Sequence, residues 1–276
     1  MTLGEALQAA QSELEPASDS PRLDAELLLA HVLGLSRGQL FTRLREPLGA
    51  AEHREFQALS QRRRRGEPVA YLTGEKGFWT LNLKVSPAVL VPRPETELLV
   101  EWALDLLNGV RAPRVLDLGT GSGALALALA SERPDAMLHA SDLSHEALRL
   151  ARENAETLGL SRVRFRNGCW LAPWSGERFE LIVSNPPYIA HGDPHLEALR
   201  HEPLMALTEG SDGLNALREI VAAAVAHLEP GGWLLVEHGY DQGEAVRALF
   251  AAAGYADIAT RRDLGGQERA TGARHG

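Results

Sequence analysis

The segment Ser184-Asn185-Pro186-Pro187-Tyr188 constrains the fold of this chain more than any other stretch. It follows the apolar run of residues 179–183, which predicts a buried strand. Proline lacks a backbone N–H and fixes φ, so the strand must end where the two prolines begin. Ligands bind at the carboxyl ends of strands in open α/β sheets. We therefore interpret residues 184–188, here called the shelf, as a rigid binding surface rather than only a proline-rich turn.

Strand and helix patterns alternate from Glu95 onward, which predicts a doubly wound, mostly parallel α/β sheet with a Rossmann-like order of elements. The expected strands cover residues 114–118, 136–141, 163–166, 179–184, 233–237, 256–261 and 268–272. The expected helices between them cover residues 124–132, 144–158, 215–228 and 242–253. Residues 94–276 are thus predicted to form one seven-stranded domain.

Residues 1–66 carry only helical signals, including the cap Ser20-Pro21, and predict a small bundle of about four helices. Residues 67–93 predict a β-hairpin that joins this bundle to the α/β domain. The four arginines of residues 62–65 form the only basic block of the chain. We interpret them first as a solvated helix C-terminus, where cations are favourable, and second as a surface for a partner.

Composition excludes several classes of protein. The net charge of -9 argues against a broad nucleic-acid surface. A single cysteine excludes an intrachain disulfide and a cysteine-rich metal site. No apolar run is long enough to cross a membrane, and the first residues do not resemble a secretory signal. We expect a cytoplasmic, monomeric protein without a bound metal.

A glycine-rich turn, Gly119-Thr120-Gly121-Ser122-Gly123, follows the first expected strand of the sheet. It lacks the lysine of a phosphate-binding loop, and its third glycine comes one position too early for the dinucleotide pattern. Asp142 ends the second strand, where a carboxylate can bind ribose hydroxyls. Together these features predict a nucleoside ligand without phosphates, of which S-adenosylmethionine is the common example.

The glycine-rich turn with Asp117, Asp142 and the shelf resembles the class I methyltransferases that modify planar amide or amine nitrogens. More narrowly, the chain resembles the release-factor glutamine methyltransferases, the PrmC/HemK family. The resemblance covers nearly the whole chain. It includes the helical N-terminus, residues 74–85, Val91-Pro92-Arg93-Pro94-Glu95-Thr96-Glu97, His201-Glu202-Pro203, residues 210–213 and residues 263–270.

The resemblance implies methyl transfer from S-adenosylmethionine to N5 of the glutamine in the Gly-Gly-Gln motif of peptide chain release factors, in support of translation termination. The expected catalytic residues are Asn185, Pro186 and Tyr188, and Pro187 joins them in the expected substrate site. The expected cofactor-binding residues are Gly119, Thr120, Gly121, Ser122, Gly123, Asp142, Trp170 and Asn185. The helical bundle of residues 1–66 is expected to recognise the protein substrate.

One position departs from the family pattern. An acidic residue near the adenine often precedes the aromatic residue after the third strand, and here that position is Cys169, before Trp170. The hydrogen bond to the adenine amino group must then come from a backbone carbonyl or from Asn167.

Two alternative functions remain open from the sequence. An adenine-N6 methyltransferase of nucleic acid shares the Asn-Pro-Pro-aromatic shelf, although the net charge argues against it. A non-catalytic scaffold that binds S-adenosylmethionine is the other alternative.

Overall fold

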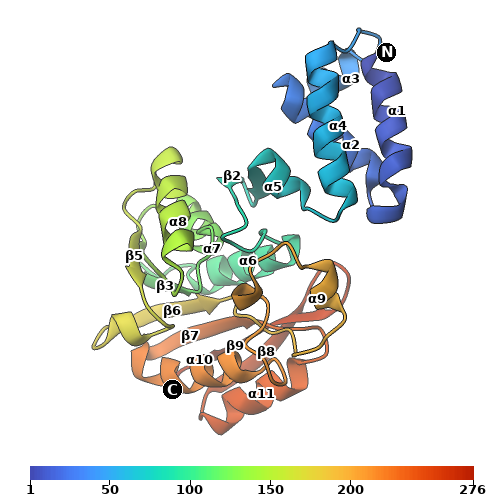
Figure 1. Cartoon of the computed structure of the whole chain (residues 1–276). Coiled ribbons are helices and arrows are strands. Elements are labelled where there is room, and N and C mark those ends of the chain that lie inside the picture. Colours follow the sequence, from blue (N-terminus) through green and yellow to red (C-terminus); the bar gives the residue numbers. More distant parts are fainter. The chain divides into compact units, whose positions relative to one another are not determined.

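The computed structural model describes all 276 residues and divides them between two units, Met1–Glu75 and Lys76–Gly276 (Figure 1). The first unit is helical, with α1 (Leu3–Leu14), η1 (Glu15–Ala17), α2 (Pro21–Leu33), α3 (Arg37–Thr42), α4 (Ala50–Arg64) and α5 (Val69–Thr73). The unit extends beyond residue 66 because Leu72 of α5 packs in the core of the bundle. No helix of the structure is both long and apolar enough to cross a membrane.

Part of the basic block is used inside the helical unit. Arg63 donates from Nε to Asp24 Oδ2 at 2.7 Å, and Asp24 is only 6% exposed. Arg62 pairs with Glu67, with Nε 2.8 Å from Oε2. These arginines therefore stabilise the bundle itself, which is consistent with their interpretation as the end of a helix.

The second unit contains the predicted seven-stranded, mostly parallel sheet. Its strands are β3 (Arg114–Leu118), β4 (Met137–Asp142), β5 (Arg164–Asn167), β6 (Phe179–Ser184), β7 (Leu228–Glu237), β8 (Ala256–Arg262) and β9 (Glu268–Arg274). They lie in the order β5-β4-β3-β6-β7-β9-β8, and β9 pairs antiparallel with both of its neighbours. The fold class predicted from the sequence is confirmed.

Helices cover both faces of this sheet (Figure 1). On one face, α6 (Glu97–Leu106) and α7 (Ala124–Glu132) contribute to one apolar core, and α8 (His145–Thr157) lies on the same side. On the other face, α10 (Asn215–Ala224) and α11 (Gly243–Ala252) contribute to the second core. The short helix α9 (His195–Ala198) lies in the long connection between β6 and α10. Because helices bury both faces of the sheet, the central strands are apolar along most of their length.

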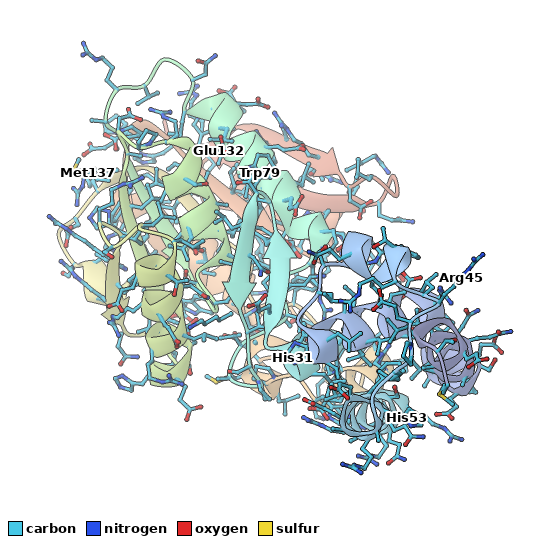
Figure 2. All side chains as sticks on the ribbon, turned by 90° about the horizontal axis from the view of Figure 1, so that it is seen from above. His31, Arg45, His53, Trp79, Glu132 and Met137 are labelled. Carbon is cyan, nitrogen blue, oxygen red and sulfur yellow. The ribbon has the colours of Figure 1, made fainter.

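The hairpin of β1 (Glu75–Phe78) and β2 (Leu81–Lys84) is attached to the second unit by side-chain hydrogen bonds. Asn154 of α8 accepts the Lys84 N–H at 2.8 Å and donates to the carbonyls of Lys84 and Ser122 at 3.0 and 2.9 Å. Trp79 donates from Nε1 to Glu132 of α7 at 2.7 Å, and Figure 2 shows these two side chains next to each other. All of the hairpin after Glu75 lies in the second unit, and these hydrogen bonds attach it there.

Candidate active site

A cavity in the second unit lies at the carboxyl ends of β3, β4 and β6. Of the site residues predicted from the sequence, it is lined by Gly119, Thr120, Gly121, Ser122, Asp142, Trp170, Asn185 and Pro187. Gly123, Pro186 and Tyr188 do not line it. Further lining residues come from the 3-10 turn η2 (Pro94–Thr96) and from the residues just before it. They include Pro92, Arg93 and Thr96.

The glycine-rich turn has a backbone that favours glycine at three positions. Gly119, Gly121 and Gly123 have φ values of 71°, 57° and 88°. A Cβ atom on Gly123 would also lie 2.9 Å from Leu127 Cδ1. The turn is tied to the end of β4, because the N–H groups of Gly119 and Thr120 both donate to Ser141 O, at 2.9 and 3.0 Å.

Asp142 presents an oriented carboxylate to the cavity. Its Oδ2 accepts the Gly121 N–H at 2.9 Å and its Oδ1 accepts the Ser144 N–H at 2.8 Å. Burial raises the pKa of Asp142, while hydrogen bonds from the backbone N–H groups of Ser144 and Gly121 oppose that rise. Each oxygen still has an unused lone pair, so the carboxylate can accept further hydrogen bonds from a ligand.

Asp117, to which the sequence assigned no separate role, is a second carboxylate in this cavity. Its Oδ2 accepts the Thr120 hydroxyl at 2.6 Å and the Ala126 N–H at 3.2 Å, whereas the buried Oδ1 has no partner. The pKa of Asp117 is raised to about 7. Burial is the main cause and the nearby Asp142 adds to the rise, whereas the hydrogen bonds from Thr120 and Ala126 oppose it. A buried oxygen without a donor is costly, and a cationic ligand group would satisfy it. Its place at the end of the first parallel strand is the signal that could have indicated it.

Trp170 has a strained backbone and an unused donor. Its φ is 40°, in the left-handed region that non-glycine residues rarely occupy. Its ring lies against Gly119, where an added Cβ would be 3.2 Å from Trp170 Cζ3, and its buried Nε1 has no partner. Asn167 is not among the residues lining the cavity, and its amide donates to the carbonyls of Asp142 and Leu143 at 3.0 and 2.9 Å. The exposed Cys169 lies beside Trp170 in the lining.

Asn185 is oriented by a single hydrogen bond. Its Nδ2 donates to Thr96 Oγ1 at 3.0 Å, so the opposite end of the amide, Oδ1, is left for a ligand. Just before it, Ser184 Oγ donates to Leu118 O at 2.9 Å, which joins the ends of β6 and β3. The shelf therefore lies directly beside the glycine-rich turn.

Tyr188 points away from the cavity, into the second core. Its hydroxyl donates to Glu237 Oε1 at 3.1 Å, and burial raises the pKa of Tyr188 well above its usual value. Its carbonyl accepts Gln242 Nε2 at 3.0 Å and would lie 2.3 Å from a Cβ on Gly213. Glu237 is 1% exposed, and burial raises its pKa to about 7 while hydrogen bonding from Thr96 and Tyr188 lowers it. Sequence reasoning assigned no role to Glu237, although it ends the strand next to β6.

Another buried carboxylate joins two loops beside the cavity. Glu202, which is 7% exposed, accepts the Val91 N–H at 3.0 Å and pairs with Arg93. Arg93 and the neighbouring Pro203 both line the cavity. The segments 91–97 and 201–203, which carried part of the family resemblance, are therefore in contact at this site.

Two family models match the chain: the PrmC N-terminal domain over residues 5–74 and the Methyltransferase small domain over residues 94–210. A release factor glutamine methyltransferase from Xylella fastidiosa is 56% identical over 91% of this chain and 92% of its own. One from Escherichia coli is 48% identical over 96% of each chain. The chain belongs to the release factor glutamine methyltransferase family.

Comparison with solved structures agrees on the fold. A methyltransferase from Pyrococcus furiosus superimposes with a TM-score of 0.54 at 21% identity, over 73% of this chain and 92% of that one. The family uses S-adenosylmethionine as the methyl donor. The residues fit such a ligand: the lining combines three carboxyl groups, those of Asp117, Asp142 and Glu209, with the indole of Trp170. Asp117 Oδ1 and Trp170 Nε1 are both buried without partners.

The raised pKa of Asp117 predicts a pH-dependent stability. Between the unfolded value near 4 and the folded value of about 7, the folded state holds a proton that the unfolded state releases, so stability falls as pH rises. Asp117→Asn removes the ionisable group, and with it this pH dependence, but keeps an oxygen that can accept the hydrogen bond from Thr120. We expect the mutant to gain melting temperature relative to wild type at pH 8 and to lose that gain at pH 5, with each kcal/mol worth about 2–4 °C.

Tryptophan fluorescence measures this effect selectively, because all five tryptophans, Trp79, Trp102, Trp170, Trp174 and Trp233, belong to the second unit. Glu101→Gln, which neutralises an exposed carboxylate of that unit, is the control. If the melting temperature of Asp117→Asn differs from that of wild type by the same amount at both pH values, the raised pKa of Asp117 is contradicted.

Proposed function

We propose that this protein transfers a methyl group from S-adenosylmethionine to the side-chain amide nitrogen of the glutamine in the Gly-Gly-Gln motif of peptide chain release factors, in the cytoplasm. The observation that carries the proposal is the orientation of Asn185, whose Nδ2 is engaged by Thr96 while Oδ1 is left to accept a hydrogen bond. The family membership of the chain supports the same substrate.

An amide nitrogen is a weak nucleophile because its lone pair is delocalised into the carbonyl group. Asn185 Oδ1 and the Pro186 carbonyl would accept its two N–H groups and hold the nitrogen in one position. The same two acceptors stabilise positive charge that develops on the nitrogen. Pro187, which lines the cavity, would complete the substrate site. Tyr188 would support the shelf from the core side through its hydrogen bond to Glu237. No strong base is required before the transfer. The methyl group would leave the sulfonium as a neutral thioether remains, and the positively charged N-methylated amide that forms is strongly acidic and releases one N–H proton to water.

S-adenosylmethionine supplies an electrophilic methyl group on a sulfonium centre. Its ribose hydroxyls would be bound by Asp142, and its ammonium group by the unpartnered oxygen of Asp117. The turn of residues 119–123 would let the backbone approach the nucleoside closely, and Trp170 would cover the adenine.

The helical unit Met1–Glu75 is proposed to recognise the release factor. The shelf alone can contact only one amide and its neighbours, whereas a specific protein interface needs about 800 Å² per partner. Adenine methylation in nucleic acid is the weaker candidate, because the chain carries a net charge of -9 and its relatives are named as release factor methyltransferases.

Asn185→Ala is the direct test of the mechanism. Loss of one oriented acceptor should lower turnover on a release factor by about 10²–10³, by analogy with the removal of one preorganised transition-state partner. S-adenosylmethionine affinity, measured by calorimetry, should change far less. Asn108→Ala, an exposed asparagine of the same unit, is the matched control. Near-normal turnover in the Asn185 mutant would refute the mechanism, and DNA as a parallel substrate tests the alternative function.

Asp142→Ala tests the cofactor site. We expect binding of S-adenosylmethionine to weaken by about 1–3 kcal/mol, because charge-assisted hydrogen bonds to the ribose are lost. An unchanged dissociation constant in calorimetry would remove Asp142 from the site.

Removal of the helical unit tests substrate recognition. A chain of residues 76–276 should still bind S-adenosylmethionine, which serves as its folding control, but should methylate intact release factor with a much lower kcat/KM. If its kcat/KM equals that of the full chain, the helical unit has another role.

A further inference from the structure

The side chain of Gln242 joins three loops at the carboxyl edge of the sheet, an arrangement here called the clamp. Gln242 is the residue just before α11, and its Oε1 accepts the Gly239 N–H at 2.8 Å. Its Nε2 donates to Tyr188 O at 3.0 Å and to Gly213 O at a longer 3.4 Å. One amide group therefore holds together the segment after β7, the end of the shelf and the approach to α10.

These three contacts allow only one orientation of the Gln242 amide. Its oxygen faces an N–H group, and its NH₂ group faces two carbonyl oxygens. If the amide were turned over, two donors would meet at Gly239, and acceptors would meet at Tyr188 and Gly213. A glutamate of the same shape would keep the contact with Gly239 and lose both donors. The clamp therefore requires an amide rather than any polar side chain of this length.

The shelf depends on anchors at its two ends. Pro186 and Pro187 have no backbone N–H, so neither can donate a hydrogen bond to a neighbouring strand. At the first end, Ser184 Oγ donates to Leu118 O at 2.9 Å. At the other end, the clamp holds the Tyr188 carbonyl. The position of the Pro186 carbonyl, a proposed acceptor for the substrate amide, is therefore determined by the contacts on both sides of it.

The contact between the end of the shelf and the approach to α10 is tightly packed. Gly213 has a φ of 76°, and a Cβ atom at this position would lie 2.3 Å from Tyr188 O. Only glycine allows two segments of backbone to approach this closely in such a conformation. Gln242 bonds to the carbonyls of both segments, so it keeps them in this arrangement.

The clamp also closes the base of the long connection between β6 and α10. This connection leaves the shelf at Tyr188 and returns at Gly213, and Gln242 bonds to both residues. Part of the connection lines the cavity, through Pro203, Met205, Ala206 and Glu209. Gln242 itself is not in the lining. It therefore acts on two walls of the cavity, the shelf and this connection, without reaching the space between them.

We propose that Gln242 is a positioning residue that acts through the Tyr188 carbonyl and holds Asn185 and Pro186 where the substrate amide must bind. It touches neither substrate nor cofactor in this arrangement. A misplacement of reacting groups by about 1 Å can lower a rate by about 10²-fold, even when its cause lies far from the chemistry. The inference rests on the proposed function, since the two acceptors that the clamp positions are those proposed for the glutamine amide.

Two variants of the full chain remove the clamp in different ways. Gln242→Met keeps the length of the side chain and removes all three hydrogen bonds, whereas Gln242→Glu removes only the two donors. On a release factor, kcat should fall roughly 10- to 100-fold in each variant. The KM for the release factor and the calorimetric Kd for S-adenosylmethionine should stay within about threefold, because the lost contacts matter in the transition state.

Gln267→Glu is the matched control. It makes the same chemical change at an exposed glutamine of the same unit, whose hydrogen bonds are made by its backbone, and it should keep wild-type kcat. All assays are run below the melting temperature of each variant, measured by tryptophan fluorescence. Wild-type kcat in either Gln242 variant would overturn the proposal. A higher KM or Kd with unchanged kcat would overturn it as well.

Hydrogen exchange provides a readout that does not require activity. Two backbone hydrogen bonds of 2.9 Å join the ends of the connection just beyond the clamp, from Ile189 N–H to Leu207 O and from His191 N–H to Ser211 O. Exchange of these two N–H groups should be roughly tenfold faster in Gln242→Met than in wild type and unchanged in Gln267→Glu.

The two readouts separate the clamp from the proposed function. If exchange is faster in Gln242→Met but wild type does not methylate a release factor, the proposed function fails and the hold of Gln242 on the shelf stands. If wild type methylates the release factor but exchange is the same in Gln242→Met as in wild type, the positioning role fails alone.

Discussion

The hydrogen bond from Ser184 Oγ to Leu118 O, between two neighbouring parallel strands, determines where the whole site can form. β3 and β6 pair in a register that places Leu118 opposite Ser184, and this bond fixes the ends of both strands. The glycine-rich turn begins one residue after Leu118, and Asn185 comes one residue after Ser184. A shift in this register would separate the proposed donor site from the proposed acceptor site. Ser184 is completely buried, so the bond is protected from water.

Buried carboxylates surround the cavity on several sides, which is unusual for a protein interior because isolated charges are expensive to bury. Asp117 and Glu237 each have one oxygen with a hydrogen-bond donor and one without. Glu202, in contrast, is compensated by Arg93 and a backbone N–H. The carboxylates with an unpartnered oxygen, Asp117 and Glu237, lie at or near the ends of parallel strands, where a ligand can supply the missing contact. Perturbed carboxyl pKa values at such a position are typical of functional sites.

The sequence predicted the parts of this site that depend on short-range patterns. The two prolines end β6 as expected, a glycine-rich turn follows β3, and Asp142 lies at the end of β4. The contacts that orient these residues join positions far apart in the chain, such as Thr96 with Asn185 and Asn154 with Lys84. No local pattern encodes such pairs, which is why Glu237 and Thr96 were missed. The aromatic ring of Tyr188 illustrates the same limit, because only the tertiary structure shows that it faces Glu237.

The carboxyl group of Asp117 gives stability and activity opposite dependences on pH. Asp117 and Glu237 have folded pKa values raised to about 7, so each stabilises the folded state when protonated and this contribution is lost as pH rises from about 4 to 7. The proposed chemistry requires Asp117 in the ionised form, so that it can bind a cationic ligand group. The enzyme would therefore be most active where this group stabilises it least. Binding of a cationic ligand beside Asp117 would reverse part of that loss, because an opposite charge lowers the pKa of a carboxyl. Ligand binding at neutral pH would then release protons, and the ligand-bound protein would depend less on pH than the free protein.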